Sequence, residues 1–184
     1  MKGLAKRLSR LGTESAFEVA RQANEWAMAG NQVFPFHIGD FNIPTPGKVV
    51  DAMNRAIANG KTGYCQPPGI PELRQALAED VGRLRGVKYA TDNVTIQPGG
   101  KPTIGKFILA IMEPGDEVLC PSPGFPIYES LIEFNEGKTV PYSFHEQEGQ
   151  FFLDLDKLKA SITPKTTILI FNNNHNPTAA ESTR

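Results

Sequence analysis

Strand-like and helix-like segments alternate along the second half of the chain, and this alternation restricts the fold more than any other feature. Apolar runs bounded by turn residues predict strands over 94–97, 117–120, 138–143 and 166–171. The segments between them predict helices over 103–112 and 125–134, a polar loop over 145–150, and a short helix from Asp154 or Asp156. Such alternation implies right-handed crossovers and a largely parallel sheet, so we expect an α/β fold.

Three further helices are expected in the first half. Apolar residues at helical spacing predict them over 16–29, 46–59 and 71–85, the last opened by Pro71 and closed by Gly86. The segment 60–70 is too rich in glycine and proline for a regular element, so we expect it to hold Tyr64 in a loop. Packing of that loop explains Tyr64 as well as a binding role does.

Composition and charge exclude several classes of protein. The chain has 184 residues, of which 40% are hydrophobic and 21% charged, as in ordinary globular proteins. A net charge of -1 provides no electrostatic basis for binding nucleic acid or an anionic membrane. No stretch approaches the roughly 18 apolar residues of a membrane span. The basic start has no apolar segment behind it, so we expect a cytoplasmic protein with Cys65 and Cys120 reduced.

A polar segment follows the last expected strand. Residues 172–176 read NNNHN, and Pro177 comes next. Open α/β sheets bind ligands at the carboxyl ends of their strands, which favours a binding role for these side chains. An Asn-Pro turn without a functional role explains the segment equally well.

A glycine turn comes between the first expected strand and the helix that follows it. Backbone N–H groups at such a helix start bind anions, phosphate above all. The turn is not a Walker A loop, because Thr95 stands where that motif has glycine and Pro102 replaces its serine or threonine. A plain chain reversal through Gly99 and Gly100 is the alternative.

Aromatic and histidine residues provide two further observations. Phe125 follows the second expected strand, where a ring either stacks on a planar ligand or packs in the core.

His37, His145 and His175 have neither metal-ligand spacing nor a partner for a catalytic triad. We therefore predict no metal site and expect surface or loop histidines, with His175 a candidate only because it precedes Asn176.

Eight short segments, in their order along the chain, resemble the aminotransferase class I and II family of pyridoxal-phosphate enzymes. They are IGDF with PTP at 38–41 and 44–46, counted together as one segment, GY at 63–64, GIPELR at 69–74, QPGGK at 97–101, PGDEV at 114–118, PSPGFPIY at 121–128, ITPKT at 162–166 and NPT at 176–178. Each segment alone is weak, but eight in register are specific. The resemblance implies the fold of the type I group, which includes aspartate and alanine aminotransferases.

The resemblance also implies roles at a pyridoxal 5'-phosphate site. Gly99, Gly100 and Lys101 correspond to the residues at the cofactor phosphate. Phe125 corresponds to the aromatic residue that stacks on the pyridine ring. Asn176 corresponds to the amide that hydrogen-bonds the 3' oxygen of the ring.

Other implied roles concern a second subunit and the substrate. Tyr64 corresponds to a residue that reaches the phosphate of the neighbouring subunit of a homodimer, and Gly39 to one beside the substrate carboxylate. By the same resemblance, residues 1–45 form an amino-terminal arm and helix that belong to the small domain and the dimer contact. Residues 46–184 then form the amino-terminal part of the large, cofactor-binding domain.

Two residues depart from the family pattern. The family's Asn-Pro-Thr is normally followed by glycine, where this chain has Ala179, which matters if the turn needs a positive φ. Pro102 removes one N–H group that would face the phosphate.

The implied activity is transfer of an amino group between an amino acid and a 2-oxo acid. No lysine here matches the family's Schiff-base lysine, and Lys101 does not take that role. No helix follows the last expected strand, so we expect the amino-terminal half of such an enzyme, inactive by itself. A pyridoxal-phosphate-dependent lyase of the same fold and a non-catalytic dimerising or regulatory remnant are the alternatives.

Overall fold

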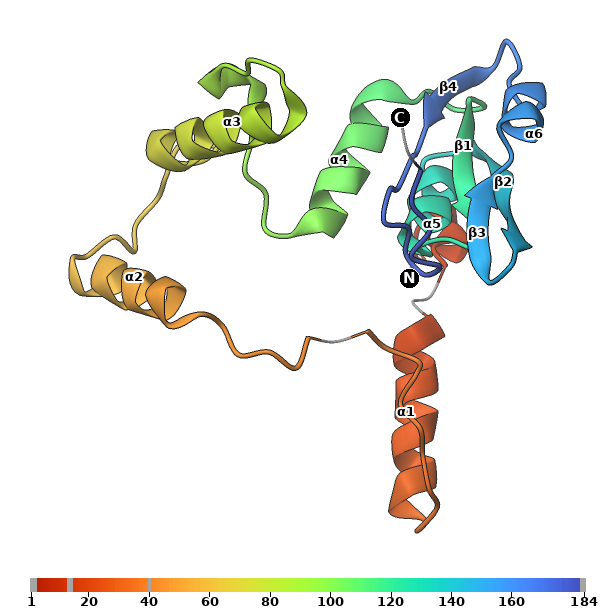
Figure 1. Ribbon diagram of the computed structural model, residues 1–184, viewed down its shortest axis with the longest axis horizontal. Helices are drawn as coiled ribbons and strands as arrows, with labels where there is room; N and C mark the ends of the chain where they lie inside the picture. Colours follow the sequence, from red (N-terminus) through yellow and green to blue (C-terminus); the bar gives the residue numbers. More distant parts are fainter. Residues whose placement is uncertain (1–2, 13–14, 40, 183–184) are drawn as a thin grey trace. The chain divides into compact units, whose positions relative to one another are not determined.

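The computed structural model describes residues 3–12, 15–39 and 41–182, and the chain forms two compact units. One comprises residues 1–38 and 101–184 and contains the sheet, and we call it the sheet unit (Figure 1). The other, residues 39–100, is called the helical unit.

Four strands form the sheet, in the order β3-β2-β1-β4. Their bounds are β1 Glu117–Ser122, β2 Lys138–Gln147, β3 Gln150–Leu153 and β4 Thr166–Leu169. β1 pairs in parallel with both β2 and β4, and β3 pairs antiparallel with β2. The predicted α/β fold with a mostly parallel sheet is therefore confirmed.

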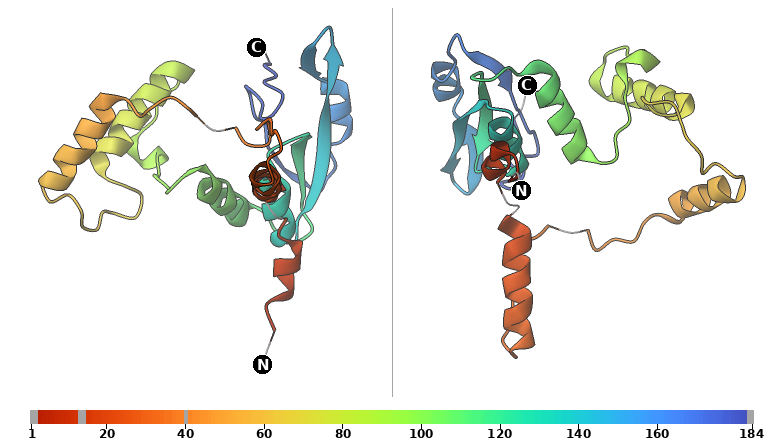
Figure 2. Two further views of the ribbon diagram at one scale, coloured as in Figure 1. Left: turned by 90° about the horizontal axis from the view of Figure 1, so that it is seen from below. Right: turned by 180° about the vertical axis from the view of Figure 1, so that it is seen from behind.

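Helices cover both faces of this sheet (Figures 1 and 2). The sheet unit contains η1 Lys6–Arg10, α1 Ser15–Met28, α5 Ile127–Phe134, α6 Leu155–Ala160 and nearly all of α4 Gly100–Ile111. Side chains of β1 alternate between the faces: Val118 and Cys120 pack with α4 and α5, and Leu119 packs with α6. β1 is thus buried from both sides.

Glu117 ties the start of β1 to its neighbours. Its carboxylate accepts hydrogen bonds from Lys138 Nζ at 2.8 Å and Thr163 Oγ1 at 2.7 Å. These two bonds, Lys138 first, hold the pKa of Glu117 below its usual range. A buried carboxylate therefore has partners on both sides of the strand.

The prediction of a polar loop over 145–150 is wrong. β2 continues to Gln147 and forms a two-residue hairpin with β3, in which Phe144 pairs with Leu153. Glu148 and Gly149 have φ of 53° and 77°, the positive values that a type I′ turn requires. Glu-Gly is a weaker hairpin signal than Asn-Gly, and the sequence pattern did not reveal it.

The strand expected at 94–97 is also absent. A 3₁₀ turn, η2 Thr91–Asn93, precedes an extended segment that belongs to no sheet. This segment lies in the helical unit, whose described residues contain no strand to pair with it. A strand forms only where a neighbour supplies hydrogen bonds.

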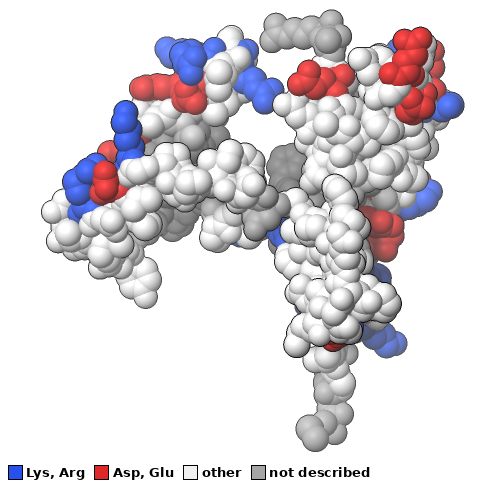
Figure 3. Space-filling model, turned by 60° about the horizontal axis from the view of Figure 1, so that its bottom comes forward, with Lys and Arg blue, Asp and Glu red and all other residues white. Residues whose placement is uncertain are grey.

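The helical unit contains α2 Gly47–Ala58 and α3 Pro71–Arg85. As predicted, Pro71 begins α3, and Gly86 ends it with φ of 65°. No helix in the described ranges of the chain has the length and apolar character to cross a membrane. In the view of Figure 3, charged side chains of both signs stand between wide uncharged areas.

Arg74 anchors the extended segment of the helical unit to α3. Its side chain is 11% exposed, and its Nε donates to the Val94 carbonyl at 2.8 Å. Its Nη2 donates to the Thr91 carbonyl at 2.9 Å. The absence of a side chain at Gly69 lets the Ile96 side chain pack directly against the backbone there, because a Cβ on residue 69 would lie 2.5 Å from Ile96 Cγ1. The chain that leads into the glycine turn is therefore held by a buried guanidinium.

We predict that Arg74→Met lowers the free energy of unfolding by about 1–3 kcal/mol, because it removes the hydrogen bonds that the guanidinium donates to the partly buried carbonyls of Val94 and Thr91. Chemical denaturation of the full-length protein measures the loss, and hydrogen exchange should show lost protection over 91–97. Arg83→Met is the matched control on the same helix, since Arg83 is exposed and pairs with Asp80, which is exposed as well. Its effect should stay within about 0.5 kcal/mol, and equal losses for the two variants would contradict the prediction.

Candidate functional site

The turn between β1 and α5 presents Phe125. β1 ends at Ser122, and α5 begins at Ile127. A Cβ on Gly124 would overlap the Pro121 carbonyl oxygen, so only glycine fits this turn. Phe125 is half-buried and meets Tyr128 edge-to-face, with ring centroids 5.7 Å apart. One ring edge is thus packed, and the residue lies at the carboxyl end of β1.

The predicted glycine turn precedes α4 directly. Gly99 has φ of 100°, and Gly100 is the first residue of the helix. No described atom lies within 4 Å of a Cβ built on either glycine, so the turn is open. A helix N-terminus carries partial positive charge and N–H groups with no partner inside the helix. This arrangement suits a phosphate group.

Lys101 connects the start of α4 to the start of α5. Its Nζ lies 5.9 Å from the ring centroid of Phe125 and 5.7 Å from that of Phe17 in α1. Both distances are those of cation–π contacts. The structure therefore brings together two of the predicted cofactor-binding residues, Lys101 and Phe125.

Asn176 lies in the loop that follows β4. Its side chain is exposed, and its backbone N–H donates to Asn172 Oδ1 at 3.0 Å. Ser182 N–H donates to Asn173 Oδ1 at 2.9 Å, so two of the asparagines shape the loop. β4 is a parallel neighbour of β1, which places this loop and Phe125 at the same edge of the sheet.

His175 is buried, although it was expected only as a surface or loop histidine. The residue does lie in the loop, but its side chain is 1% exposed. Burial lowers the pKa of its imidazole, so the ring is neutral at neutral pH. No hydrophobic pattern surrounds His175 in the sequence, and its burial depends on Phe144 of β2, 31 positions earlier, whose ring centroid lies 4.4 Å away.

Ala179 adopts the conformation that glycine normally supplies. Its φ is 57°, in the left-handed region. The turn after Asn176 therefore needs a positive φ, and alanine occupies it at a steric cost.

The remaining predicted residues belong to the helical unit. Tyr64 is in a loop, as expected, but its side chain is fully exposed and does not pack that loop down. Gly39 lies in an irregular segment, and the adjacent Asp40 of the IGDF motif is outside the described residues. The roles assigned to Tyr64 and Gly39 stay predictions.

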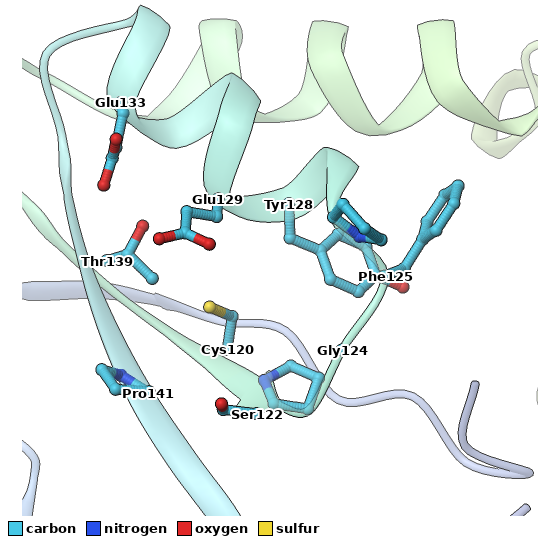
Figure 4. A pocket seen from close by; sticks show the side chains of 11 residues that line it. Cys120, Ser122, Gly124, Phe125, Tyr128, Glu129, Glu133, Thr139 and Pro141 are labelled. Carbon is cyan, nitrogen blue, oxygen red and sulfur yellow. The ribbon is translucent and has the colours of Figure 1, made fainter. Parts of the chain in front are cut away.

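A cavity of about 250 Å³ lies between α5 and the sheet, and the turn that carries Phe125 forms part of its lining. Figure 4 shows the side chains of Cys120, Glu129 and Thr139 turned toward it, and the Phe125 ring pointing away. Burial, with a smaller contribution from Glu129, raises the pKa of the Cys120 thiol to about 11. Cys120 is therefore an uncharged thiol at neutral pH. Sequence reasoning did not find this cavity, because its lining residues come from three separate elements.

Comparison with known proteins gives a consistent result. The profile of the family Aminotransferase class I and II matches residues 31–184. The aspartate/prephenate aminotransferase of Thermus thermophilus is 35% identical over 180 residues, which are 98% of this chain and 46% of that protein. The chain thus spans about half the length of the curated relatives it matches.

Solved structures agree in fold. The aspartate aminotransferase of Rhizobium meliloti superposes with a TM-score of 0.91 at 31% identity, covering 100% of this chain and 46% of that one. The alanine aminotransferase of Pyrococcus furiosus superposes with a TM-score of 0.89 at 32% identity, covering 97% and 46%. Similarity of this extent confirms the fold of the type I group.

We predict that Gly124→Ala lowers the free energy of unfolding by about 1–3 kcal/mol, because the new methyl group displaces the Pro121 carbonyl. Denaturant titration of the full-length protein measures this. Gly47→Ala is the control, since the space around Gly47 at the start of α2 is open. A Gly124→Ala variant as stable as the control would show that the turn is wider than described.

Ala179→Gly should instead raise the free energy of unfolding, by about 0.5–1 kcal/mol. Glycine relieves the left-handed strain, and its greater freedom in the unfolded chain offsets only part of that gain. The same titration measures it. Ala180→Gly, at a buried neighbouring position, should be destabilising. Destabilisation by both changes would contradict the positive φ at residue 179.

Proposed function

Because the chain belongs to the aminotransferase class I and II family, we propose that its protein transfers amino groups between an amino acid and a 2-oxo acid. Enzymes of this family use pyridoxal phosphate. When bound, that cofactor supplies an electron-withdrawing ring that stabilises negative charge at the substrate Cα. Two of the curated relatives that the chain matches are aspartate/prephenate aminotransferases, which favours transfer over the lyase alternative.

One observation supports the proposal: Lys101, at the start of α4, lies 5.9 Å from the ring centroid of Phe125 at the carboxyl end of β1. The open glycine turn and helix start fit a phosphate. The half-buried Phe125 ring suits a planar heterocycle, and the exposed Asn176 amide suits a ring oxygen. An anion, a ring and a polar substituent are the parts of pyridoxal phosphate, so the residues present fit the group.

In this proposal each residue has a defined task. Gly99, Gly100 and Lys101 bind the phosphate at the start of α4, through the positive end of the helix and the charge of Lys101. Phe125 packs on the pyridine ring and fixes its plane. Asn176 donates its side-chain N–H to the 3' oxygen, which stabilises negative charge there.

The proposal extends to the assembly. The protein is a cytoplasmic homodimer, in which Tyr64 reaches the phosphate bound by the partner subunit and Gly39 lies beside the substrate carboxylate. Residues 1–45 serve the small domain and the dimer contact, and residues 46–184 serve the cofactor domain. Residues 1–184 expressed alone are inactive, since no lysine among them matches the family's Schiff-base position.

The test uses the full-length protein from its natural source with aspartate and alanine as first donors. We expect the protein to bind pyridoxal phosphate and to convert an added 2-oxo acid to the corresponding amino acid. Chromatography measures the amino acid that is formed. Release of ammonia without that product would instead identify a lyase. A protein that does not bind the cofactor would support the non-catalytic remnant.

A substitution at Phe125 tests the site itself. We expect Phe125→Leu to weaken cofactor binding about three- to tenfold, because ring stacking contributes about 0.5–1.5 kcal/mol. Fluorescence titration of the cofactor-free protein measures the dissociation constant. Phe151→Leu in β3 is the matched control and should leave it unchanged. Equal weakening by both variants would argue against a stacking role for Phe125.

A further inference from the structure

The imidazole of His175 is enclosed on several sides. Its Nδ1 lies 2.8 Å from Thr178 Oγ1. The Phe144 ring packs against it with an interplanar angle of 35°. Nε2 is buried and has no hydrogen-bond partner among the described residues. A side chain with this cost of burial needs a compensating structural or functional role.

The loop backbone closes around the same residue. His175 N–H donates to the Ala180 carbonyl at 3.0 Å, and Ala179 N–H donates to the His175 carbonyl at 2.6 Å. Ala180 N–H also donates to Thr178 Oγ1 at 3.3 Å. The Thr178 hydroxyl therefore joins the imidazole to the loop backbone, so that ring and loop form one unit.

The residue after His175 is exposed to solvent, in contrast to the buried imidazole. His175 is buried, whereas Asn176 is exposed. Fixing the imidazole between Phe144 and Thr178 restricts the backbone at 175, and that backbone directly precedes Asn176. An anchor on the inner side therefore limits the orientations open to the amide on the outer side.

We propose that His175 is a positioning residue for Asn176, holding the loop so that the Asn176 amide faces the 3' oxygen of the cofactor. The inference rests on the proposed function, because it assigns Asn176 to that oxygen. Without the anchor the loop samples other conformations. Apparent affinity then falls by the fraction of molecules in which the amide is correctly placed.

The decisive variants remove the anchor without removing its volume. His175→Phe keeps a ring against Phe144 but loses the contact with the Thr178 hydroxyl. Thr178→Val removes that hydroxyl with little change of shape. His145→Phe is the matched control, because His145 is an exposed histidine that stacks on Phe152 in the hairpin.

Two readouts are made on the full-length protein: the dissociation constant of pyridoxal phosphate, and the absorption spectrum of the bound cofactor across a pH titration. We expect His175→Phe and Thr178→Val each to weaken binding about fivefold. Both should shift the spectral titration in the same direction as Asn176→Ala, and His145→Phe should change neither. The double variant His175→Phe/Asn176→Ala should be no worse than Asn176→Ala, since the anchor acts only through that amide.

The outcomes separate this inference from the proposed function. If the wild-type protein does not bind pyridoxal phosphate, the proposed function fails and the inference fails with it. If the wild-type protein binds but His175→Phe keeps its affinity and spectrum, only the inference is overturned. Independent, additive effects of His175→Phe and Asn176→Ala overturn it as well. Should His175→Phe fail to fold, Thr178→Val decides by the same criteria.

Discussion

The parallel pairing of β1 with strands on both sides is the constraint on which the sheet unit depends. β1 is the only strand flanked on both sides by parallel strands within the described residues, and its Val118, Leu119 and Cys120 are almost fully buried. Because helices cover both faces of β1, its side chains are buried on either face, and each buried valine or leucine contributes about 1.5–3 kcal/mol to the stability of the fold. Glu117 adds partners on either side at its start. The rest of the unit packs around this strand.

The candidate site follows from the direction of these strands. Parallel strands end at one edge, so the turn after β1 and the loop after β4 come together there. The contact of Lys101 with the Phe125 ring places the start of α4 at that turn. Backbone topology thus brings the Lys101 side chain to the Phe125 ring and directs the Asn176 loop to the same edge of the sheet, although 75 positions separate Lys101 from Asn176.

The elements that sequence patterns predicted well are those whose signals are local. The start of α3 at Pro71 and its end at Gly86 depend on residues that restrict their own backbone angles. Ala179 is different, because the sequence left open whether its turn needs a positive φ, and the structure shows a φ of 57° that alanine itself disfavours. Local restriction of φ acts in any surroundings, and for that reason it can be read in advance.

The failures involve partners distant in the sequence. Residues 94–97 have strand-like composition but no neighbouring strand in their unit, and β3 pairs through a Glu-Gly turn of weak sequence signal. The burial of His175 needs Phe144 from another strand. Each outcome depends on which surfaces meet, which a one-dimensional pattern does not contain.

By itself the sequence determined the α/β class, the helix ends and the motifs of the aminotransferase family, because these are set by short-range periodicity and by residues with restricted backbones. The tertiary structure alone decided that Lys101 contacts the Phe125 ring, that His175 is enclosed beneath the Asn176 loop, and that a cavity lies behind α5. Contacts between side chains far apart in the chain depend on how sheet and helices pack, and packing is a property of the whole fold.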